Sequence, residues 1–426
     1  MRPLLRALAA LLLAGLCLGL GSARAAELEA LTIEPPGAAA PIPRAYFGIH
    51  VHNDGVQRNW PDIPVGSLRL WDAGVAWASL EPRRGQWDFR LLDEYLDWAK
   101  GRGIEVLLTL GMTPRWASAR PDEASVYGPG LAAEPADIED WRRYVRRVVE
   151  HSKGRVVAYQ VWNEANLPEF FSGSPAALRQ LAAVAQQEVR RGDANARLVM
   201  PSGTGLDHRI GWMAQTLSAG MKGSVDVAAF HLYHGKEAPE VKIEPLRKLL
   251  ALWAASGSAT VPLWNTESGY NIDSPLVAWT PAERPGLLSE ERVTAYLPRD
   301  MLLARALGFE RFFWYDWDGK RMGMLEPGTK RHRPLADVYA QLIQALSGTV
   351  LHRCERGGTG LWNCRLSRAD GVELRAYWVD PAASAQRQTL AVRGTQRMRL
   401  DGRSRWQAVD GPLEIGPVIT LVSGQP

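Results

Sequence analysis

Two glutamates in this chain each follow a Trp-Asn pair closely. Glu164 stands in VWNEANLPEFF (Val161–Phe171) and Glu267 in LWNTESGY (Leu263–Tyr270). A protonated carboxyl group can donate a proton to a departing oxygen, and an ionised one can attack an electron-poor carbon. Two carboxyl groups with these roles, one on each side of the bond, are what hydrolysis of a glycosidic bond requires. The alternative is that both motifs are ordinary strand ends, each with a tryptophan packed in the core. A third Trp-Asn pair, at Trp362, has no glutamate beside it, so Trp-Asn alone does not indicate an active site.

Secondary structure decides whether the two glutamates can meet. Near-continuous apolar runs alternate with helical patterns, which predicts a parallel sheet covered on both faces. Eight such runs fit a closed β/α (TIM) barrel better than an open sheet, and all strand carboxyl ends of a barrel open onto one face. Glu164 after the fourth run and Glu267 after the seventh would then project into one cleft. The runs are YFGIHV (46–51), SLRLW (67–71), EVLLTL (105–110), VAYQVW (157–162), RLVMP (197–201), VDVAAF (225–230), PLWN (262–265) and RFFWY (311–315).

Capping residues mark several of the helices between these runs. We expect a helix after Asp88, its N-cap, that stops at Gly101, and another from Ile138 to His151. Ser174-Pro175 predicts a third helix start, with an N-cap followed by proline at the first position.

After Gly348 the sequence pattern changes to short runs of alternating apolar and polar residues separated by Gly and Asp turns. This pattern predicts a small β-sandwich. We therefore expect a barrel over residues 26–345 and a sandwich over 346–426. The strand-like segment Glu27–Pro35 is a candidate to pair with the sandwich.

Cys354 and Cys364 flank a Gly-rich stretch that is typical of a hairpin turn. The two thiols could meet across paired strands, and in an exported protein a disulfide is the favoured interpretation. Two buried free thiols are the alternative. No Cys/His spacing typical of a metal site occurs, and the carboxylate pair explains the chemistry without a metal, so we expect none. A metal site formed by the histidines at the strand ends is the alternative.

Residues 1–25 have the features of an export signal: a basic start, an apolar stretch and a small-x-small cleavage site ending at Ala25. We expect a periplasmic, inner-membrane-associated or secreted protein, with an uncleaved anchor as the alternative. The net charge of +4 includes Arg2, Arg6 and Arg24. Without this segment 47 bases face 46 acids, so the charge does not indicate a nucleic-acid partner.

Several motifs together resemble glycoside hydrolase family 39, a family of retaining enzymes on this barrel. They are TLGMTPRWAS (Thr109–Ser118), VWNEANLPEFF and FHLYHG (Phe230–Gly235). The resemblance is strongest to bacterial enzymes encoded with exopolysaccharide biosynthesis genes, which cut the polymer endolytically and carry a C-terminal β-sandwich. It implies Glu164 as acid/base and Glu267 as nucleophile. The commoner motif has proline where Ala165 stands, which changes a backbone preference and leaves the carboxylate in place.

The resemblance and the strand-end positions suggest further polar site residues. Arg69 matches an inward-facing arginine that would hold a carboxylate ionised, with a structural ion pair as the alternative. Tyr233 resembles a tyrosine that hydrogen-bonds the nucleophile. Asn163 is placed to bind a sugar hydroxyl. The remaining candidates are three histidines at strand ends: His50, His52 and His231. We expect them to contact substrate, and a purely supporting role is the alternative.

Tryptophan is abundant, with 17 copies, and an indole can stack on the apolar face of a sugar ring. Trp116, Trp314 and Trp317 lie in motifs near the expected cleft. Each is a candidate sugar platform, and core packing is the alternative for Trp314 and Trp116.

The sequence thus predicts a monomeric retaining β-glycosidase that needs no cofactor. The carboxyl separation should be about 5–5.5 Å, the spacing for direct nucleophilic attack. The expected substrate is a bacterial exopolysaccharide, cut endolytically, with the export machinery or inner membrane as expected partners. Two alternatives stay open: an exo-acting β-xylosidase-like enzyme, and a non-catalytic polysaccharide-binding or scaffolding component.

Overall fold

The computed structural model describes residues 28–37, 39–52, 59–205, 223–233, 235–255, 257, 260–381 and 387–424. The expected export signal, residues 1–25, lies outside these ranges. No helix among the described residues is long and apolar enough to cross a membrane.

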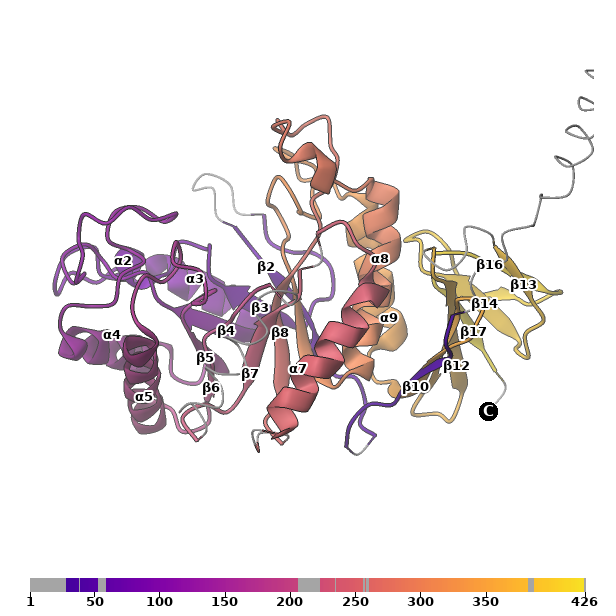
Figure 1. Ribbon diagram of the computed structural model, residues 1–426, viewed down its shortest axis with the longest axis horizontal. Coiled ribbons are helices and arrows are strands. Elements are labelled where there is room, and N and C mark those ends of the chain that lie inside the picture. Colours follow the sequence, from indigo (N-terminus) through magenta and orange to yellow (C-terminus); the bar gives the residue numbers. More distant parts are fainter. Residues whose placement is uncertain are drawn as a thin grey trace, which may run out of the picture.

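A parallel sheet of eight strands forms the centre of the larger module (Figure 1). Its order, β6-β5-β4-β3-β2-β9-β8-β7, is that of a barrel opened between β6 and β7. Isolated parallel bridges from Val199 to Val227 and from Gly203 to Phe230 close that gap. The eight strands are β2 (Phe47–His50), β3 (Ser67–Leu70), β4 (Glu105–Leu110), β5 (Ala158–Val161), β6 (Arg197–Val199), β7 (Ala228–His231), β8 (Leu263–Ser268) and β9 (Phe309–Trp314).

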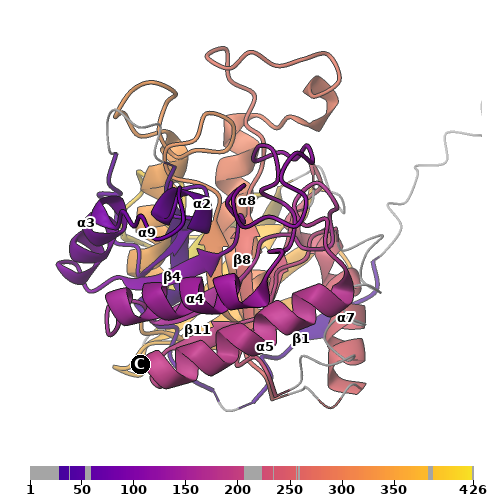
Figure 2. The same ribbon diagram turned by 90° about the vertical axis from the view of Figure 1, so that its left-hand side faces the viewer.

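Helices surround this sheet. Its strands are therefore largely buried on both faces, as the continuous apolar runs predict. Figure 2 shows α4 and α5 side by side across the face turned to the viewer. The β/α barrel expected from the sequence is confirmed. The helices are η1 (Arg44–Tyr46), α2 (Trp77–Leu80), α3 (Arg90–Lys100), α4 (Ile138–Ser152), α5 (Pro175–Gly192), η3 (Pro239–Lys242), α7 (Ile243–Ala255), η4 (Arg284–Gly286), α8 (Glu290–Ala306) and α9 (Pro334–Leu346).

Two of the expected helix starts can be compared directly. Ser174 caps α5 with its side chain, which accepts from the Ala177 amide at 3.1 Å. Asp88 was expected to cap α3, but the N-cap is Phe89. The Asp88 carboxylate instead accepts from the amide and the guanidinium of Arg90, so it satisfies a first-turn donor from one position earlier.

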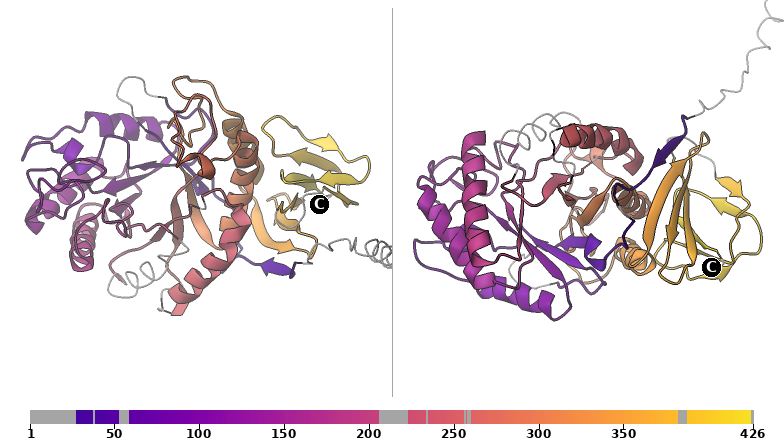
Figure 3. Two further views of the ribbon diagram at one scale, coloured as in Figure 1. Left: turned by 45° about the horizontal axis from the view of Figure 1, so that its top comes forward. Right: turned by 90° about the horizontal axis from the view of Figure 1, so that it is seen from below.

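A smaller antiparallel module follows the barrel and confirms the expected β-sandwich (Figures 1 and 3). The seven-stranded sheet has the order β1-β10-β11-β12-β17-β14-β15, and β13 pairs with β16. Its edge strand β1 comes from the segment before the barrel. The strands are β1 (Leu31–Ile33), β10 (Val350–Arg356), β11 (Leu361–Ser367), β12 (Glu373–Val379), β13 (Gln388–Leu390), β14 (Gln396–Arg399), β15 (Gln407–Ala408), β16 (Leu413–Ile415) and β17 (Thr420–Ser423).

A disulfide joins Cys354 on β10 to Cys364 on β11, where the two residues stand opposite each other with their Cα atoms 4.0 Å apart. Both cysteines are fully buried. The hairpin between the strands therefore places the thiols as its Gly-rich turn suggested.

A buried ionic cluster joins the barrel to the sandwich. Glu240 of η3 accepts at 2.8 Å from Arg299 of α8 and, through the same oxygen, at 2.8 Å from the indole of Trp378 on β12. All three side chains are buried, and Lys242 pairs with Asp300 nearby on the same two barrel elements. Because a buried carboxylate needs such donors, the two modules depend on each other across this contact.

Candidate active site

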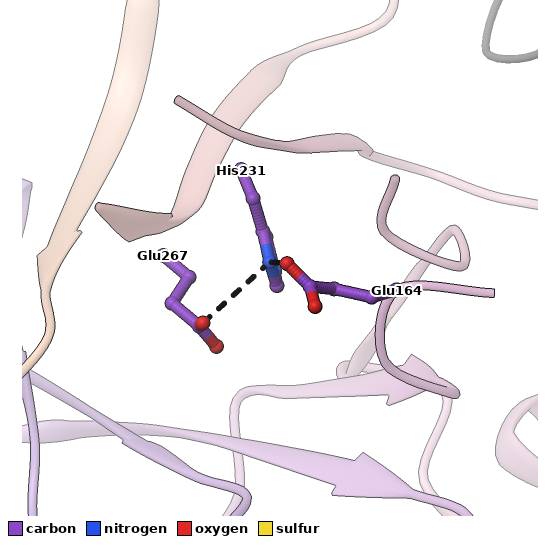
Figure 4. Close-up of side chains that lie close together, drawn as sticks. All are labelled: Glu164, His231 and Glu267. Atoms are coloured by element: carbon purple, nitrogen blue, oxygen red, sulfur yellow. Dashed lines mark hydrogen bonds and ion pairs between the residues drawn. The ribbon is translucent and has the colours of Figure 1, made fainter. Parts of the chain in front are cut away.

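Glu164, His231 and Glu267 meet at the carboxyl ends of the barrel strands (Figure 4). Glu164 follows β5, His231 ends β7, and Glu267 is the last residue but one of β8. His231 Nδ1 lies 2.9 Å from Glu164 Oε1 and 3.7 Å from Glu267 Oε1. The carboxylate side chains are only 10% and 9% exposed, so the fold brings the two glutamates together in a largely dry site.

The spacing of the two carboxyl groups determines what they can do. One oxygen of Glu164 and one of Glu267 lie within 4.8 Å of each other. Retaining glycosidases space these groups about 5–5.5 Å apart, whereas inverting enzymes need roughly 6.5–9.5 Å to admit a water molecule. This closest approach of the two carboxyl groups lies on the retaining side of that division, so the pair suits direct attack by one carboxylate.

Arg69 of β3 binds Glu267 from inside the barrel. Its fully buried guanidinium donates to Glu267 Oε2 at 2.8 Å, to Asn163 Oδ1 at 2.7 Å and to Gln160 Oε1 at 2.8 Å. Three acceptors fix the guanidinium plane, which in turn fixes both Glu267 and Asn163.

A second donor reaches the other oxygen of Glu267. Tyr233 donates its hydroxyl proton to Oε1 at 2.8 Å. Burial raises the pKa of Glu267, and the charge of the Arg69 guanidinium opposes this rise. Burial also raises the Tyr233 pKa well above its usual value, so this hydroxyl stays a hydrogen-bond donor. With a cation on one oxygen and a hydroxyl on the other, Glu267 is solvated for its ionised form.

Glu164 is held differently. Burial raises its pKa to about 7, against the opposing effects of a hydrogen bond from Thr204 and the Arg69 charge. At neutral pH this carboxyl group is therefore divided between its protonated and ionised forms, which suits a group that must give and take a proton.

Local backbone geometry aims Glu164 into the cleft. Trp162 and Glu164 have positive φ values of 62° and 44°, a region that is costly for residues with a side chain. The Glu164 amide donates to Ser202 Oγ at 3.1 Å and the Ala165 amide to the Ser202 carbonyl at 3.0 Å. Proline, the commoner residue in place of Ala165, could not donate that second bond.

His231 is fully buried, and burial lowers its pKa to about 3. It is therefore a neutral imidazole beside Glu164. Its Nδ1, together with one oxygen of each glutamate, could in principle hold a metal ion. The Arg69 guanidinium already bonded to Glu267 opposes a second cation at that position, so these residues fit proton chemistry better than metal binding.

The other two histidines differ in environment. His50 is buried, with Nε2 3.0 Å from the Thr266 carbonyl, and burial lowers its pKa well below the usual value. His52 is 21% exposed and lies against Asp316 and the Tyr315 hydroxyl. Burial disfavours its charged form, but Asp316 outweighs this and the pKa rises to about 9. His52 is thus the histidine of this pair with surface left to meet a ligand.

The three tryptophans proposed as sugar platforms expose little of their ring faces. Trp314 and Trp317 are 0% and 1% exposed, so both rings pack in the core, which for Trp314 is the stated alternative. Trp116 is partly exposed, but its indole N–H donates to the Glu81 carbonyl and the Arg84 guanidinium lies 4.7 Å from its ring. Sugar stacking at the cleft cannot use the first two without rearrangement of the core.

Three side chains that the sequence did not single out border the site. The Tyr315 hydroxyl donates to Asp72 Oδ2 at 2.9 Å, and Asn163 Nδ2 lies 3.5 Å from the Tyr127 hydroxyl. Asp72 is 29% exposed and raises the pKa of both Glu164 and Glu267. Tyr315 directly follows β9, and Asp72 is the second residue after β3. A position just after the carboxyl end of a barrel strand is the sequence signal that could have identified both.

Known proteins similar to this chain include glycosidases. The family model described as "Beta-galactosidase" (Glyco_hydro_42) matches residues 67–130. A β-galactosidase, BbgII, from Bifidobacterium bifidum is 30% identical over 155 residues, which are 32% of this chain. The chain spans only 22% of that relative's length.

Solved structures similar to this one include several of family 39. A family 39 glycoside hydrolase from Bacteroides cellulosilyticus has a TM-score of 0.69 at 16% identity, over 90% of this chain and 81% of that one. A family 39 β-xylosidase from Caulobacter crescentus has a TM-score of 0.62 at 16% identity, over 92% of this chain and 99% of that one. The chain shares the fold of family 39 glycoside hydrolases. At these identities the likeness concerns the fold, which agrees with the resemblance seen in the motifs.

Proposed function

We propose that the protein is a retaining β-glycoside hydrolase with Glu267 as nucleophile and Glu164 as acid/base. The observation that carries this proposal is the pair of carboxyl oxygens within 4.8 Å in unlike environments. Glu267 accepts from a guanidinium and a hydroxyl, whereas burial holds the pKa of Glu164 at about 7.

The two roles follow one another in a double displacement. The Glu267 carboxylate attacks the anomeric carbon while protonated Glu164 gives its proton to the departing glycosidic oxygen. The bond to the leaving sugar breaks and a glycosyl ester forms on Glu267. Glu164, now ionised, takes a proton from a water molecule whose oxygen attacks the same carbon. The ester bond breaks, the sugar leaves with retained configuration, and Glu164 is protonated again.

Neighbouring groups support the charge changes of these steps. Arg69 and Tyr233 stabilise the Glu267 carboxylate before attack and after release of the sugar. Asn163, held by Arg69 at 2.7 Å, is placed beside the attacking oxygen to bind a hydroxyl of the sugar. Neutral His231 lies 2.9 Å from Glu164 Oε1 and orients that carboxyl group.

For the substrate we propose a bacterial exopolysaccharide, cut within the chain during its synthesis, export or turnover. The export-type N-terminus and the motif resemblance to enzymes of exopolysaccharide gene clusters support this choice. The same arguments favour a periplasmic or inner-membrane-associated location. An exo-acting β-xylosidase is the second candidate, because a solved structure with this fold is described as a β-xylosidase.

The test follows the size distribution of a purified exopolysaccharide incubated with the protein. Glu267→Gln and Glu164→Gln variants serve beside the wild type, and NMR of the first products reads the anomeric configuration. Rapid shortening by the wild type alone, with retained configuration, supports the proposal. Release of single sugars without shortening favours exo action. Binding without any turnover would favour a scaffolding role.

A further inference from the structure

A second hollow lies where the sandwich meets the end of α9. It has a volume of about 440 Å³, and its walls come from both modules. The barrel contributes Gln344, Ser347 and Thr349, and the sandwich contributes Arg368, Asp370 and Trp406. Pockets of this size, formed between modules, are common places for small ligands.

Trp406 distinguishes this hollow from the rest of the molecule. Among the described tryptophans it alone is exposed, with 36% of its surface open. An exposed indole offers the flat apolar face on which the C–H side of a sugar ring stacks. At the cleft, by contrast, Trp314 and Trp317 are buried.

The loop that carries Trp406 is fixed in place. The buried Gln341 of α9 donates to the Ser404 carbonyl at 2.8 Å and accepts from the Gly402 amide at 2.9 Å. The Asp401 carboxylate accepts from the Ser404 amide at 2.7 Å inside the same loop. A platform held in this way loses little freedom when a ligand binds.

Polar groups suited to sugar hydroxyls surround the indole. Arg368 and Asp370 form an ion pair at 2.8 Å on the turn between β11 and β12, and both are about half exposed. The exposed Gln344 adds a side-chain amide, which can both donate and accept. Donors and acceptors of both signs around one aromatic face favour a neutral, hydroxyl-rich ligand over an ion.

The topology separates this hollow from the catalytic carboxylates. α9 starts after the loop that follows β9, at the face where Glu164 and Glu267 lie, and runs back along the barrel. Its last turn, with Gln344, therefore lies at the opposite end of the strands. A single short sugar chain could not fill both places.

We propose that Trp406, with Arg368, Asp370 and Gln344, forms a non-catalytic binding site for a neutral polysaccharide. This inference rests on the proposed function, because it makes the same polymer the ligand of both sites. The second site holds a long chain to the enzyme between cuts. It raises the effective concentration of polymer at the cleft and has no effect on a substrate too short to span the distance.

Affinity gel electrophoresis tests the site without turnover. Glu267→Gln protein, with and without Trp406→Ala, is run through gels that contain soluble xylan, β-galactan, mixed-linkage β-glucan or a purified bacterial exopolysaccharide. We expect retardation in at least one gel, weakened about three- to tenfold in apparent affinity by Trp406→Ala, the size of one lost aromatic contact. Trp406→Phe should keep most of the retardation, and Leu252→Ala, which alters a 46% exposed residue on α7, should keep all of it.

Equal retardation of the Trp406→Ala and parent proteins, or no retardation in any gel, would overturn the site. Thermal unfolding of each variant separates loss of the site from loss of the fold. In the active background, Trp406→Ala should slow the cutting of long polymer and leave hydrolysis of a short aryl glycoside unchanged. Trp406-dependent retardation without hydrolysis by the wild type would leave the site standing and refute the proposed function.

Discussion

Arg69 on the second barrel strand donates to Glu267 on the seventh at 2.8 Å, with both side chains almost completely enclosed. The strands that carry them are not neighbours in the sheet, so this ion pair crosses the barrel interior. The guanidinium is therefore positioned by the barrel as a whole, and its charge acts on one oxygen of the proposed nucleophile.

Replacing Arg69 by methionine removes that charge with little change of volume. We expect kcat/KM to fall at least about 100-fold, since a buried carboxylate loses its cation. Because Arg69 favours the ionised form of Glu267, its loss raises the Glu267 pKa and moves the acidic limb of the pH–kcat/KM profile to higher pH. Arg84→Met, which alters a 62% exposed arginine paired with Asp140, is the control and should stay within about twofold. An unmoved acidic limb would contradict the role given to Arg69.

Glu164→Gln should change how stability depends on pH. The folded-state pKa of Glu164 is about 7, above its usual 4.5, so between these values the folded protein keeps a proton that the unfolded chain has lost. Wild-type stability is therefore expected to fall by roughly 2–3 kcal/mol as pH rises from 4.5 to 8 through this group. Glutamine does not ionise, so the free energy of unfolding of the variant should rise relative to that of the wild type as pH rises. Urea unfolding of both proteins at pH 5 and pH 8 measures this, and parallel pH dependences would refute it.

Ala165→Pro would restore the commoner form of the motif in this chain. The substitution removes the amide that donates to the Ser202 carbonyl at 3.0 Å. We expect a loss of about 1 kcal/mol in the free energy of unfolding, the usual value of one hydrogen bond, with kcat within about threefold of the wild type. Ala165→Gly keeps the amide and serves as control. A proline variant more stable than the wild type would show that the bond matters less than the restriction of φ.

Removal of the disulfide should affect stability alone. Cys354→Ala/Cys364→Ala opens a cross-link between residues that are 10 apart in the chain. We expect a loss of about 2–3 kcal/mol in the free energy of unfolding. Activity towards a short aryl glycoside should be unchanged, because neither cysteine lies in the barrel. Thermal unfolding of wild type with and without reductant provides the comparison, and a variant that resists heat as well as the oxidised wild type would contradict this expectation.

The sequence predicted the barrel and its two glutamates because strand-end positions follow from period and count, and every strand end opens onto one face. It could not decide the roles of Trp314 and Trp317. Whether an indole faces solvent or core depends on what the loops pack against it, and both rings are enclosed. The sequence could not place Tyr127 beside the site for a related reason. Its long loop is held by contacts such as Arg120 to Glu134 and Arg120 to Ser172, which join segments that have no local pattern in common.

The buried contact of Trp378 with Glu240 bears on how this gene can evolve. The sandwich supplies an indole donor to a carboxylate that otherwise belongs to the barrel. A recombination event that exchanged the sandwich for an unrelated one would leave that carboxylate without this donor and would uncover the apolar surface around it. The two modules are thus expected to be inherited together, and a shortened gene product that ends before β10 should aggregate instead of yielding an independent barrel.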